Sequence, residues 1–249
     1  MTASPTLRRA LTDVAAFSRL FLPRWELRPY QTAPAQAIFD RVGRRSGDQL
    51  GIVFSRQSGK DELLAQVLAA LLVRHSRSGG SIVVAAPTHR PQARISRDRL
   101  WHRLRSHPLL ASLATASEAT IAVGEARVTF VSAAPTANAR GQTADLLLVA
   151  NEAQDILTDT WDAVFDPMAA STNAPTLVTA GFEPANAKGP PGTLPNRLSH
   201  HAVPSGQGGL TSTQNRACPT PCFSTVTRTP SRCSSSRFCS YPHSFTRST

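Results

Sequence analysis

Five short apolar runs spread over the first 181 residues are the feature that most constrains how this chain can fold. Several of them are continuous rather than alternating, which is typical of strands buried on both faces of a sheet. Helix-like segments lie between the runs; they begin at Asp61, at Pro91 and near Thr160. Strands and helices that alternate at this spacing predict an α/β fold with a mainly parallel sheet flanked by helices. The runs are LGIVFS (50–55), SIVVAAP (81–87), RVTFVSA (127–133), ADLLLVA (144–150) and TLVTAG (176–181).

Charge is divided unevenly along the chain. The net charge is +11, and all 16 acidic residues lie at or before Glu183, so residues 184–249 carry seven basic and no acidic side chains. That segment is rich in Ser, Thr, Pro and Arg, and such a composition cannot bury enough apolar surface to offset its conformational entropy. It also holds all four cysteines, whose spacing lacks the close pairs of zinc modules. We therefore expect an N-terminal extension over 1–24, a folded domain over 25–183, and a basic tail over 184–249 that is disordered or translated from a shifted reading frame.

The segment SRQSGKDE, from Ser55 to Glu62, directly follows the first apolar run and directly opens an apolar helix-like segment. Lys60 within it is the only lysine among the first 183 residues. A turn between a strand and a helix presents backbone N–H groups and a helix N-terminus to phosphate groups, and a lysine adds a point charge. The segment therefore predicts a phosphate-binding loop, although Phe54 replaces the first glycine of the general pattern and Asp61 replaces its hydroxyl residue.

A second half of such a site is expected at the end of another buried strand. The run LLLVA is followed by Asn151 and Glu152. In sites that transfer a phosphoryl group to water, the first of these positions holds Mg²⁺ and the following glutamate orients and deprotonates the attacking water. Glu152 is therefore the candidate general base.

Several motifs in order resemble the N-terminal ATPase domain of phage terminase large subunits, which has a RecA-like P-loop fold. The resemblance covers roughly residues 25–182 and is specific only as a set. LRPYQ resembles the adenine-reading Q motif, and SRQSGK resembles the terminase variant of the phosphate loop, with an internal arginine. The other matching segments are VVAAPTHRPQARI, ARGQTADLLLVANEAQD with WDAVFDPMAAST, and TLVTAG.

The resemblance implies a role for each matching residue. Lys60 would bind the β- and γ-phosphates, Arg56 would stabilise charge on the transferred phosphoryl group, and Glu152 would activate water. Gln31 would read adenine with Tyr30 or Pro29 packed nearby, and Thr179 and Gly181 would begin the motif that couples hydrolysis to movement. The implied ATP-binding set is Tyr30, Gln31, Ser55, Arg56, Gln57, Ser58, Gly59, Lys60 and Asp61.

Two departures from the family pattern concern the metal. Asp61 stands where the family has a hydroxyl residue, and Asn151 stands where it has a carboxylate. We expect Asp61 to supply the anionic oxygen for Mg²⁺ and Asn151 to supply a neutral carbonyl oxygen, which preserves the net charge of the site. The alternative is a degenerate site that binds nucleotide poorly.

The resemblance further implies ATP and Mg²⁺ as ligands, double-stranded DNA, a portal protein and a small terminase subunit as partners, and assembly into a homo-oligomeric ring. Arg90, Arg94 and Arg97 are expected to share a helix face that approaches DNA. No carboxylates follow Glu183, so we expect no nuclease activity of the metal-dependent kind. Without a spanning segment or signal peptide, the expected location is the cytoplasm of a bacterial cell. A helicase-like translocase and a non-catalytic prophage remnant are the alternative functions.

Overall fold

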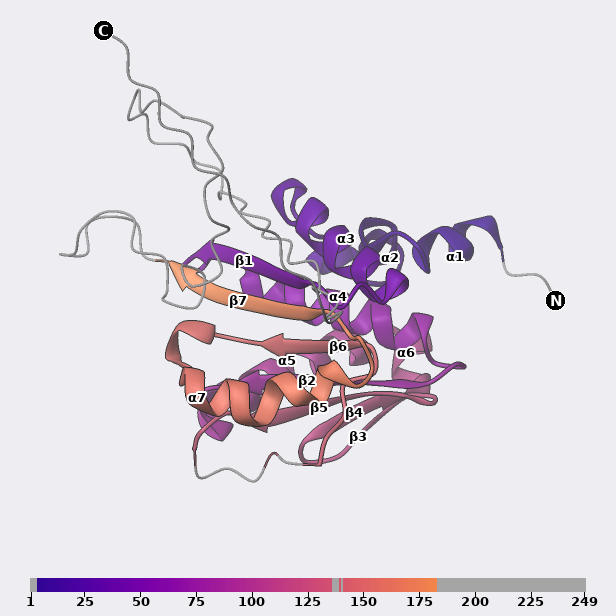
Figure 1. The fold of residues 1–249 in the computed structure, drawn as a ribbon. Helices are drawn as coiled ribbons and strands as arrows, with labels where there is room; N and C mark the ends of the chain where they lie inside the picture. The colour runs from indigo at the N-terminus through magenta and orange to yellow at the C-terminus, as the bar shows by residue number, and fades with distance from the viewer. Residues whose placement is uncertain (1–3, 136–138, 140, 183–249) are drawn as a thin grey trace, which may run out of the picture.

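The computed structural model describes residues 4–135, 139 and 141–182, and within them seven strands form one sheet. Neighbouring strands are parallel except at one edge, where β3 and β4 form an antiparallel extension beside β5. Strand β7 lies between β1 and β6, so the last strand of the described chain separates two strands that precede it (Figure 1). In sheet order the strands are β1 (Gln49–Ser55), β7 (Thr176–Phe182), β6 (Leu147–Ala150), β2 (Gly80–Ala86), β5 (Ala126–Ser132), β4 (Thr120–Val123) and β3 (Ala114–Ala116).

Helices cover both faces of the sheet, as Figure 1 shows. One face carries α1 (Pro5–Ala10), α2 (Val14–Phe21), η1 (Pro23–Trp25), α3 (Pro29–Arg44), α4 (Lys60–Arg74), η2 (His89–Ala93), α5 (Arg94–Arg105) and α6 (Pro108–Leu113). The other carries α7 (Thr158–Thr160), η4 (Trp161–Phe165) and α8 (Asp166–Ala170), and the short turn η3 (Ala153–Asp155) follows β6. The predicted α/β fold with a mainly parallel sheet is confirmed.

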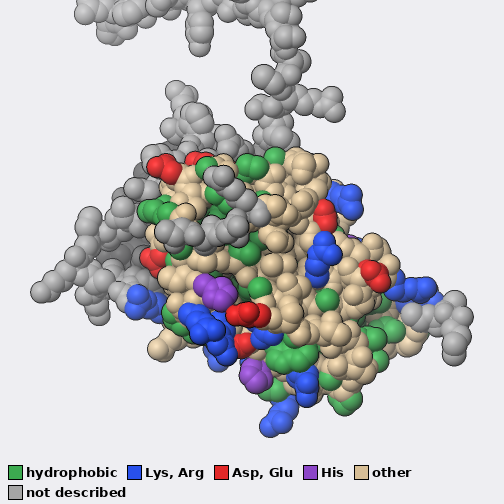
Figure 2. All heavy atoms as spheres, turned by 90° about the horizontal axis from the view of Figure 1, so that it is seen from below, with side chains coloured by type: hydrophobic (Ala, Val, Ile, Leu, Met, Phe, Trp, Pro, Cys, Tyr) green, Lys and Arg blue, Asp and Glu red, His purple; other side chains and the backbone are tan. Residues whose placement is uncertain are grey.

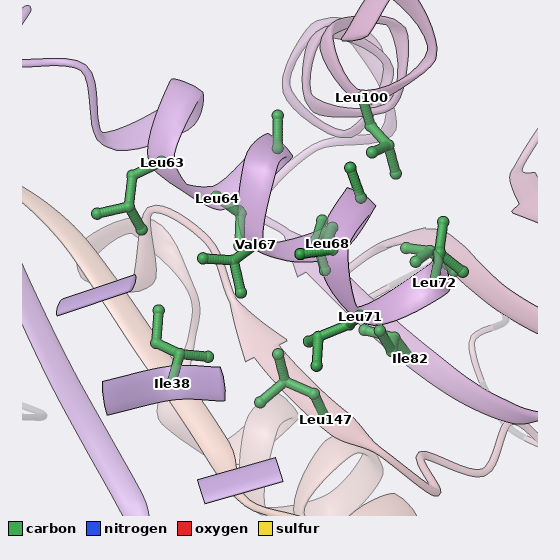
Figure 3. Close-up of a cluster of buried hydrophobic side chains, with 14 of the residues drawn as sticks. Ile38, Leu63, Leu64, Val67, Leu68, Leu71, Leu72, Ile82, Leu100 and Leu147 are labelled. Carbon is green, nitrogen blue, oxygen red and sulfur yellow. The ribbon is translucent and has the colours of Figure 1, made fainter. Parts of the chain in front are cut away.

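The core is split in two by the sheet, because successive strand residues point to opposite faces. Val84 packs with the α4 side, whereas its neighbours Val83 and Ala85 pack with the α8 side. Helix α4 is buried from Leu63 to Leu72, and Figure 3 shows its leucines meeting Ile82 and Leu147 from the sheet and Leu100 from α5. A largely apolar helix that is buried on all sides over this stretch is therefore central to this domain.

The predicted N-terminal extension shares the core of the domain. Asp13 caps α2 by accepting a hydrogen bond from the Ala16 N–H at 3.0 Å. Phe17 and Leu22 are fully buried in the same cluster as α4. The expected boundary at residue 25 therefore does not separate two hydrophobic cores.

Phe17 offers a test of this docking. Its ring is fully buried and lies 4.9 Å from that of Phe21, so Phe17→Ala is expected to lower the free energy of unfolding by about 3–5 kcal/mol. Leu20→Ala on the same helix is the matched control, because Leu20 is 38% exposed and should cost far less. Urea unfolding of both variants measures the difference. Equal, small losses would mean that α2 contributes little to the core.

Most differences from the expected elements lie at their ends. The strand expected from residue 144 begins at Leu147, because the Asp145 and Leu146 N–H groups both bond to the Ser81 carbonyl before the ladder starts. The helix expected from Pro91 becomes regular only at Arg94. Helices α1, α2, α3 and α6 and the hairpin of β3 and β4 were not expected.

The expectation that Arg90, Arg94 and Arg97 share one helix face is wrong. Arg90 has extended backbone, with φ −123° and ψ 126°, so it is not part of a helix and cannot share a helix face with Arg94 and Arg97. The residue that precedes a proline is sterically pushed away from helical geometry, and Pro91 follows Arg90.

Two further points concern the chain as a whole. Among the described residues, no helix combines the length and the apolar character needed to cross a bilayer. The tail expected over 184–249, with its four cysteines, lies outside the residues that the structure describes.

Candidate nucleotide site

The loop between β1 and α4 has the backbone of a phosphate-binding turn. Gln57 and Gly59 have left-handed φ values of 60° and 84°, and α4 begins at Lys60 immediately afterwards. A side chain at Gly59 would bring its Cβ within 2.6 Å of Gln31 Nε2, so both the dihedral angle and the space require glycine. The turn therefore presents the N-terminus of a 15-residue helix at the carboxyl edge of the sheet.

Lys60 is the centre of the site. Its side chain is almost buried, and its Nζ lies 2.7 Å from Glu152 Oε1, 2.9 Å from Asn151 Oδ1 and 3.4 Å from Asp61 Oδ1. The structure thus brings together the loop lysine and the two polar residues after β6, which lie about ninety positions away in the sequence. Such a buried ammonium group is stabilised by the oxygen atoms that surround it.

Asn151 connects four parts of the fold. Its Oδ1 accepts hydrogen bonds from Lys60 Nζ at 2.9 Å and from Thr179 Oγ1 at 2.8 Å, and its Nδ2 donates to Ser96 Oγ at 3.1 Å. These partners belong to α4, β7 and α5, and Asn151 itself directly follows β6. An amide oxygen has two lone pairs, so both are used in this arrangement.

Glu152 is held in an uncommon conformation directly beside Lys60. Its φ of 53° and ψ of 51° lie in the left-handed region, which costs energy for a residue with a side chain and is concentrated at functional sites. Burial raises the pKa of its carboxyl group, but hydrogen bonds from Gln154 and Lys60, the charge of Lys60, and a backbone hydrogen bond from Gly181 outweigh burial and hold the pKa below its ordinary value. Glu152 is therefore ionised at neutral pH.

Tyr30 and Gln31 brace the loop from the first turn of α3. The Tyr30 hydroxyl donates to the Ser58 carbonyl at 2.7 Å, and Gln31 Nε2 donates to the Gly59 carbonyl at 2.9 Å. Gln31 Oε1 also accepts the Arg28 N–H at 2.9 Å, so both ends of this buried amide are engaged. Adenine recognition by these residues stays a prediction; the observed contacts fix the loop.

A cleft of about 820 Å³ opens over these groups. Its floor is the loop from Ser55 to Asp61, one wall is formed by residues of η2 and α5, and the other by Asn151, Glu152 and Gly181. Three cationic side chains and three carboxylates line it, namely Arg56, Lys60 and Arg99 against Asp61, Glu152 and Asp155. This volume lies in the range of small-molecule sites, and its polar lining suits a charged ligand.

Sequence reasoning missed the contributions of α5 and of Gln154. Ser96 and Arg99 line the cleft, and Gln154 donates to Glu152 Oε2 at 2.8 Å. The sequence could have indicated Gln154, because it lies two positions after Glu152, the candidate base. The α5 residues carried no signal of their own, because their position depends on how α5 packs against the sheet.

The three arginines expected to approach DNA lie on the other side of α5. Arg90, Arg94 and Arg97 line a separate pocket of about 290 Å³, together with His89 and Glu118. Arg97 is committed to local contacts, with its Nε 3.1 Å from the Ser117 carbonyl and its NH1 2.7 Å from Asp98 Oδ1. On the face seen in Figure 2, basic side chains lie in separate groups beside acidic and histidine side chains rather than as one continuous basic surface.

Together, these features define a class of fold. A mainly parallel sheet carries a glycine-lysine turn between β1 and a buried helix, and polar side chains follow β6, the next strand but one, at the same edge. This is the arrangement of a RecA-like P-loop α/β domain.

Two solved structures are similar to this chain. The large terminase of bacteriophage HK97 aligns with a TM-score of 0.56 and 21% sequence identity over 68% of this chain. A variant of the large terminase ATPase domain of Thermus phage P74-26 aligns with a TM-score of 0.46 and 19% identity, over 56% of this chain and 61% of that one. The predicted RecA-like fold is confirmed by the likeness to the HK97 protein.

The likeness covers only part of the HK97 protein, and two further comparisons found no match. The aligned part spans 37% of the HK97 terminase chain. No protein-family model matches the sequence, and no curated protein matches it.

Proposed function

We propose that this chain is an ATP-hydrolysing motor domain of the phage large terminase type, which couples ATP hydrolysis to the packaging of double-stranded DNA. The observation that carries the proposal is the contact of Lys60 Nζ with both Glu152 and Asn151 at the N-terminus of α4. A cation, a carboxylate and a helix N-terminus thus lie around one cleft, and this combination supports phosphate binding and activation of water.

The proposed chemistry assigns one role to each group. Lys60 binds the β- and γ-phosphates, the loop amides from Gln57 to Gly59 surround them, and Arg56 stabilises the charge that develops on the transferred phosphoryl group. Glu152 accepts a proton from the attacking water. Because Lys60 and Glu152 form an ion pair at 2.7 Å, phosphate binding draws the lysine toward the nucleotide and leaves the carboxylate oxygen to the water.

The residues at this site fit a magnesium ion. Asp61 Oδ1 is buried at the first turn of α4 and has no hydrogen-bond partner among the described residues, and a carboxylate oxygen is the ligand that Mg²⁺ prefers. When bound, the ion would neutralise charge on the β- and γ-phosphates. Asp61 is its proposed anionic ligand. Asn151 Oδ1 could serve as a second ligand only after Lys60 has turned to the phosphates, because Lys60 and Thr179 occupy it.

The coupling residues are proposed from their contacts with the same site. Thr179 donates to Asn151 Oδ1, and a backbone hydrogen bond from Gly181 reaches Glu152. Both residues belong to β7, so a change around the phosphates alters the bonds of this strand directly. The continuation of the chain after β7 is where such a change would be transmitted.

The proposed partners follow from the terminase resemblance. They are double-stranded DNA, contacted by Arg90, Arg94 and Arg97, a portal protein and a small terminase subunit, with other copies of the chain forming a ring in the cytoplasm of a bacterial cell. In the pocket that the three arginines line, Arg90 and Arg94 support the DNA contact, because arginines bind phosphate groups without regard to sequence, whereas Arg97 would first have to leave Ser117 and Asp98.

ATP hydrolysis by the full chain, with and without Mg²⁺ and double-stranded DNA, tests the proposal. We expect hydrolysis that requires Mg²⁺ and rises when DNA is added, because a translocating motor couples ATP hydrolysis to movement along DNA. Release of phosphate from ATP is the measurement. Absence of both hydrolysis and ATP-dependent thermal stabilisation would overturn it and favour a non-catalytic remnant.

A further inference from the structure

One face of α5 and the preceding turn is turned to the nucleotide cleft. The residues that line the cleft from this side are Gln92, Ile95, Ser96 and Arg99. Their spacing places them on one side of a helix. Ser96 is bonded through Asn151 to the site of Lys60, and Arg99 lies one turn further along the same face.

The guanidinium of Arg99 lies at the cleft with a buried Nε that has no hydrogen-bond partner among the described residues. Its nearest acidic contact is Glu62 Oε2, which lies 3.8 Å from NH1 and so beyond hydrogen-bond distance. Glu62 is already occupied, since Arg103 donates to its two oxygens at 2.7 and 2.6 Å.

Arg103, one turn further along α5, differs from Arg99 because its guanidinium is fully engaged in contacts within the protein. It forms the paired hydrogen bonds to Glu62, and its guanidinium lies 4.3 Å from the centre of the Trp25 ring. Only 14% of its side chain is exposed, against 37% for Arg99. Arg99 therefore keeps donors for a ligand, whereas Arg103 holds α5 against α4.

The charges that line the cleft favour a cation at the position of Arg99. Asp61 adds a carboxylate at the phosphate loop, and with Glu152 and Asp155 it would leave the lining negative if Lys60 and Arg56 were its only cations. An excess of negative charge opposes the binding of a polyphosphate. Arg99 restores the balance from the neighbouring helix.

We infer that Arg99 is a phosphate-binding residue of this cleft: its guanidinium donates to phosphate oxygens of the bound nucleotide, and its charge balances the third carboxylate of the lining. The inference rests on the proposed function and adds a residue outside the phosphate loop. The planar fork of an arginine suits phosphate oxygens better than a lysine does.

Nucleotide binding by the full chain tests this role. Binding of ATP and of AMP in the presence of Mg²⁺ is measured for Arg99→Gln, Arg99→Lys and the control Arg105→Gln, which changes an exposed arginine of the same helix that does not line the cleft. We expect Arg99→Gln to weaken ATP binding by about tenfold or more, as for loss of a charged hydrogen bond. AMP binding should change much less. The ATP affinity of Arg99→Lys should lie between that of the unaltered chain and that of Arg99→Gln.

Each other outcome has a defined meaning. ATP binding by Arg99→Gln at full strength, beside a Lys60→Ala variant that fails to bind, would overturn the role of Arg99 and leave the proposed function standing. Equal losses for ATP and AMP, or an equal loss in Arg105→Gln, would also overturn it, because they would indicate a structural or general charge effect. If the unaltered chain bound no ATP, the proposed function and this inference would fall together.

Discussion

Glu152→Gln is expected to lower the rate of ATP hydrolysis by a factor of about 10²–10⁴ while leaving ATP binding intact. The amide has nearly the shape of the carboxylate, so it can still accept a hydrogen bond from Lys60 through its carbonyl oxygen. It cannot accept a proton from water. The loss should therefore appear in kcat, because the interaction removed is made in the transition state.

The measurement is steady-state phosphate release together with an ATP titration of each protein. Glu125→Gln is the matched control, because Glu125 is exposed beside the start of β5, at the opposite edge of the sheet from the cleft. A Glu152→Gln variant that hydrolyses ATP at the unaltered rate would place the general base elsewhere.

The pH dependence of the unaltered chain follows from the same contacts. Burial alone would raise the pKa of Glu152, but the hydrogen bonds of Gln154 and Lys60 and the charge of Lys60 lower it below its ordinary value of 4.5. The carboxylate and its contribution to stability are thus present above that value and are lost as the pH falls through the lower folded pKa. We expect kcat/KM to show no loss from protonation of Glu152 between pH 6 and 8, and an acid limb in that range that disappears in Glu152→Gln would contradict this.

The central pair of the site could be predicted from the sequence for a simple reason. Lys60 ends the short turn after one buried strand and Glu152 lies just after another, and the carboxyl ends of parallel strands meet at one edge of a sheet. No knowledge of helix packing was needed. The sheet order was also unnecessary, although the insertion of β7 explains why Thr179 reaches Asn151.

Contacts that depend on the rotation and packing of helices could not be predicted. Ser96 and Arg99 line the cleft because of the way α5 packs beside α4, and the many basic residues along α5 do not mark which of them faces the cleft. The hydrogen bond of the buried Gln31 amide to the loop backbone was not predicted, and its expected reading of adenine stays a prediction. Arg90 was assigned to a helix on spacing alone, and the effect of Pro91 on its backbone was overlooked.

Lys60→Ala is expected to weaken ATP binding severely and to abolish hydrolysis. Lys60 is the cation placed among Asp61, Asn151 and Glu152, and without it the two carboxylates would repel the incoming phosphates. Loss of a charged contact of this kind costs about 3 kcal/mol, which corresponds to roughly a hundredfold weaker binding. Hydrolysis should fall further, because the same charge also stabilises the transition state.

Lys60→Arg separates the charge of this residue from its shape. Arginine keeps the positive charge, but its planar fork is larger than an ammonium group, and Lys60 Nζ is enclosed by oxygens at 2.7, 2.9 and 3.4 Å. We therefore expect Lys60→Arg to bind ATP better than Lys60→Ala but to hydrolyse it poorly, as measured by parallel titrations and phosphate release. Full activity in Lys60→Arg would show that the cleft needs only a cation here, and the close fit of the ammonium group would then have no catalytic meaning.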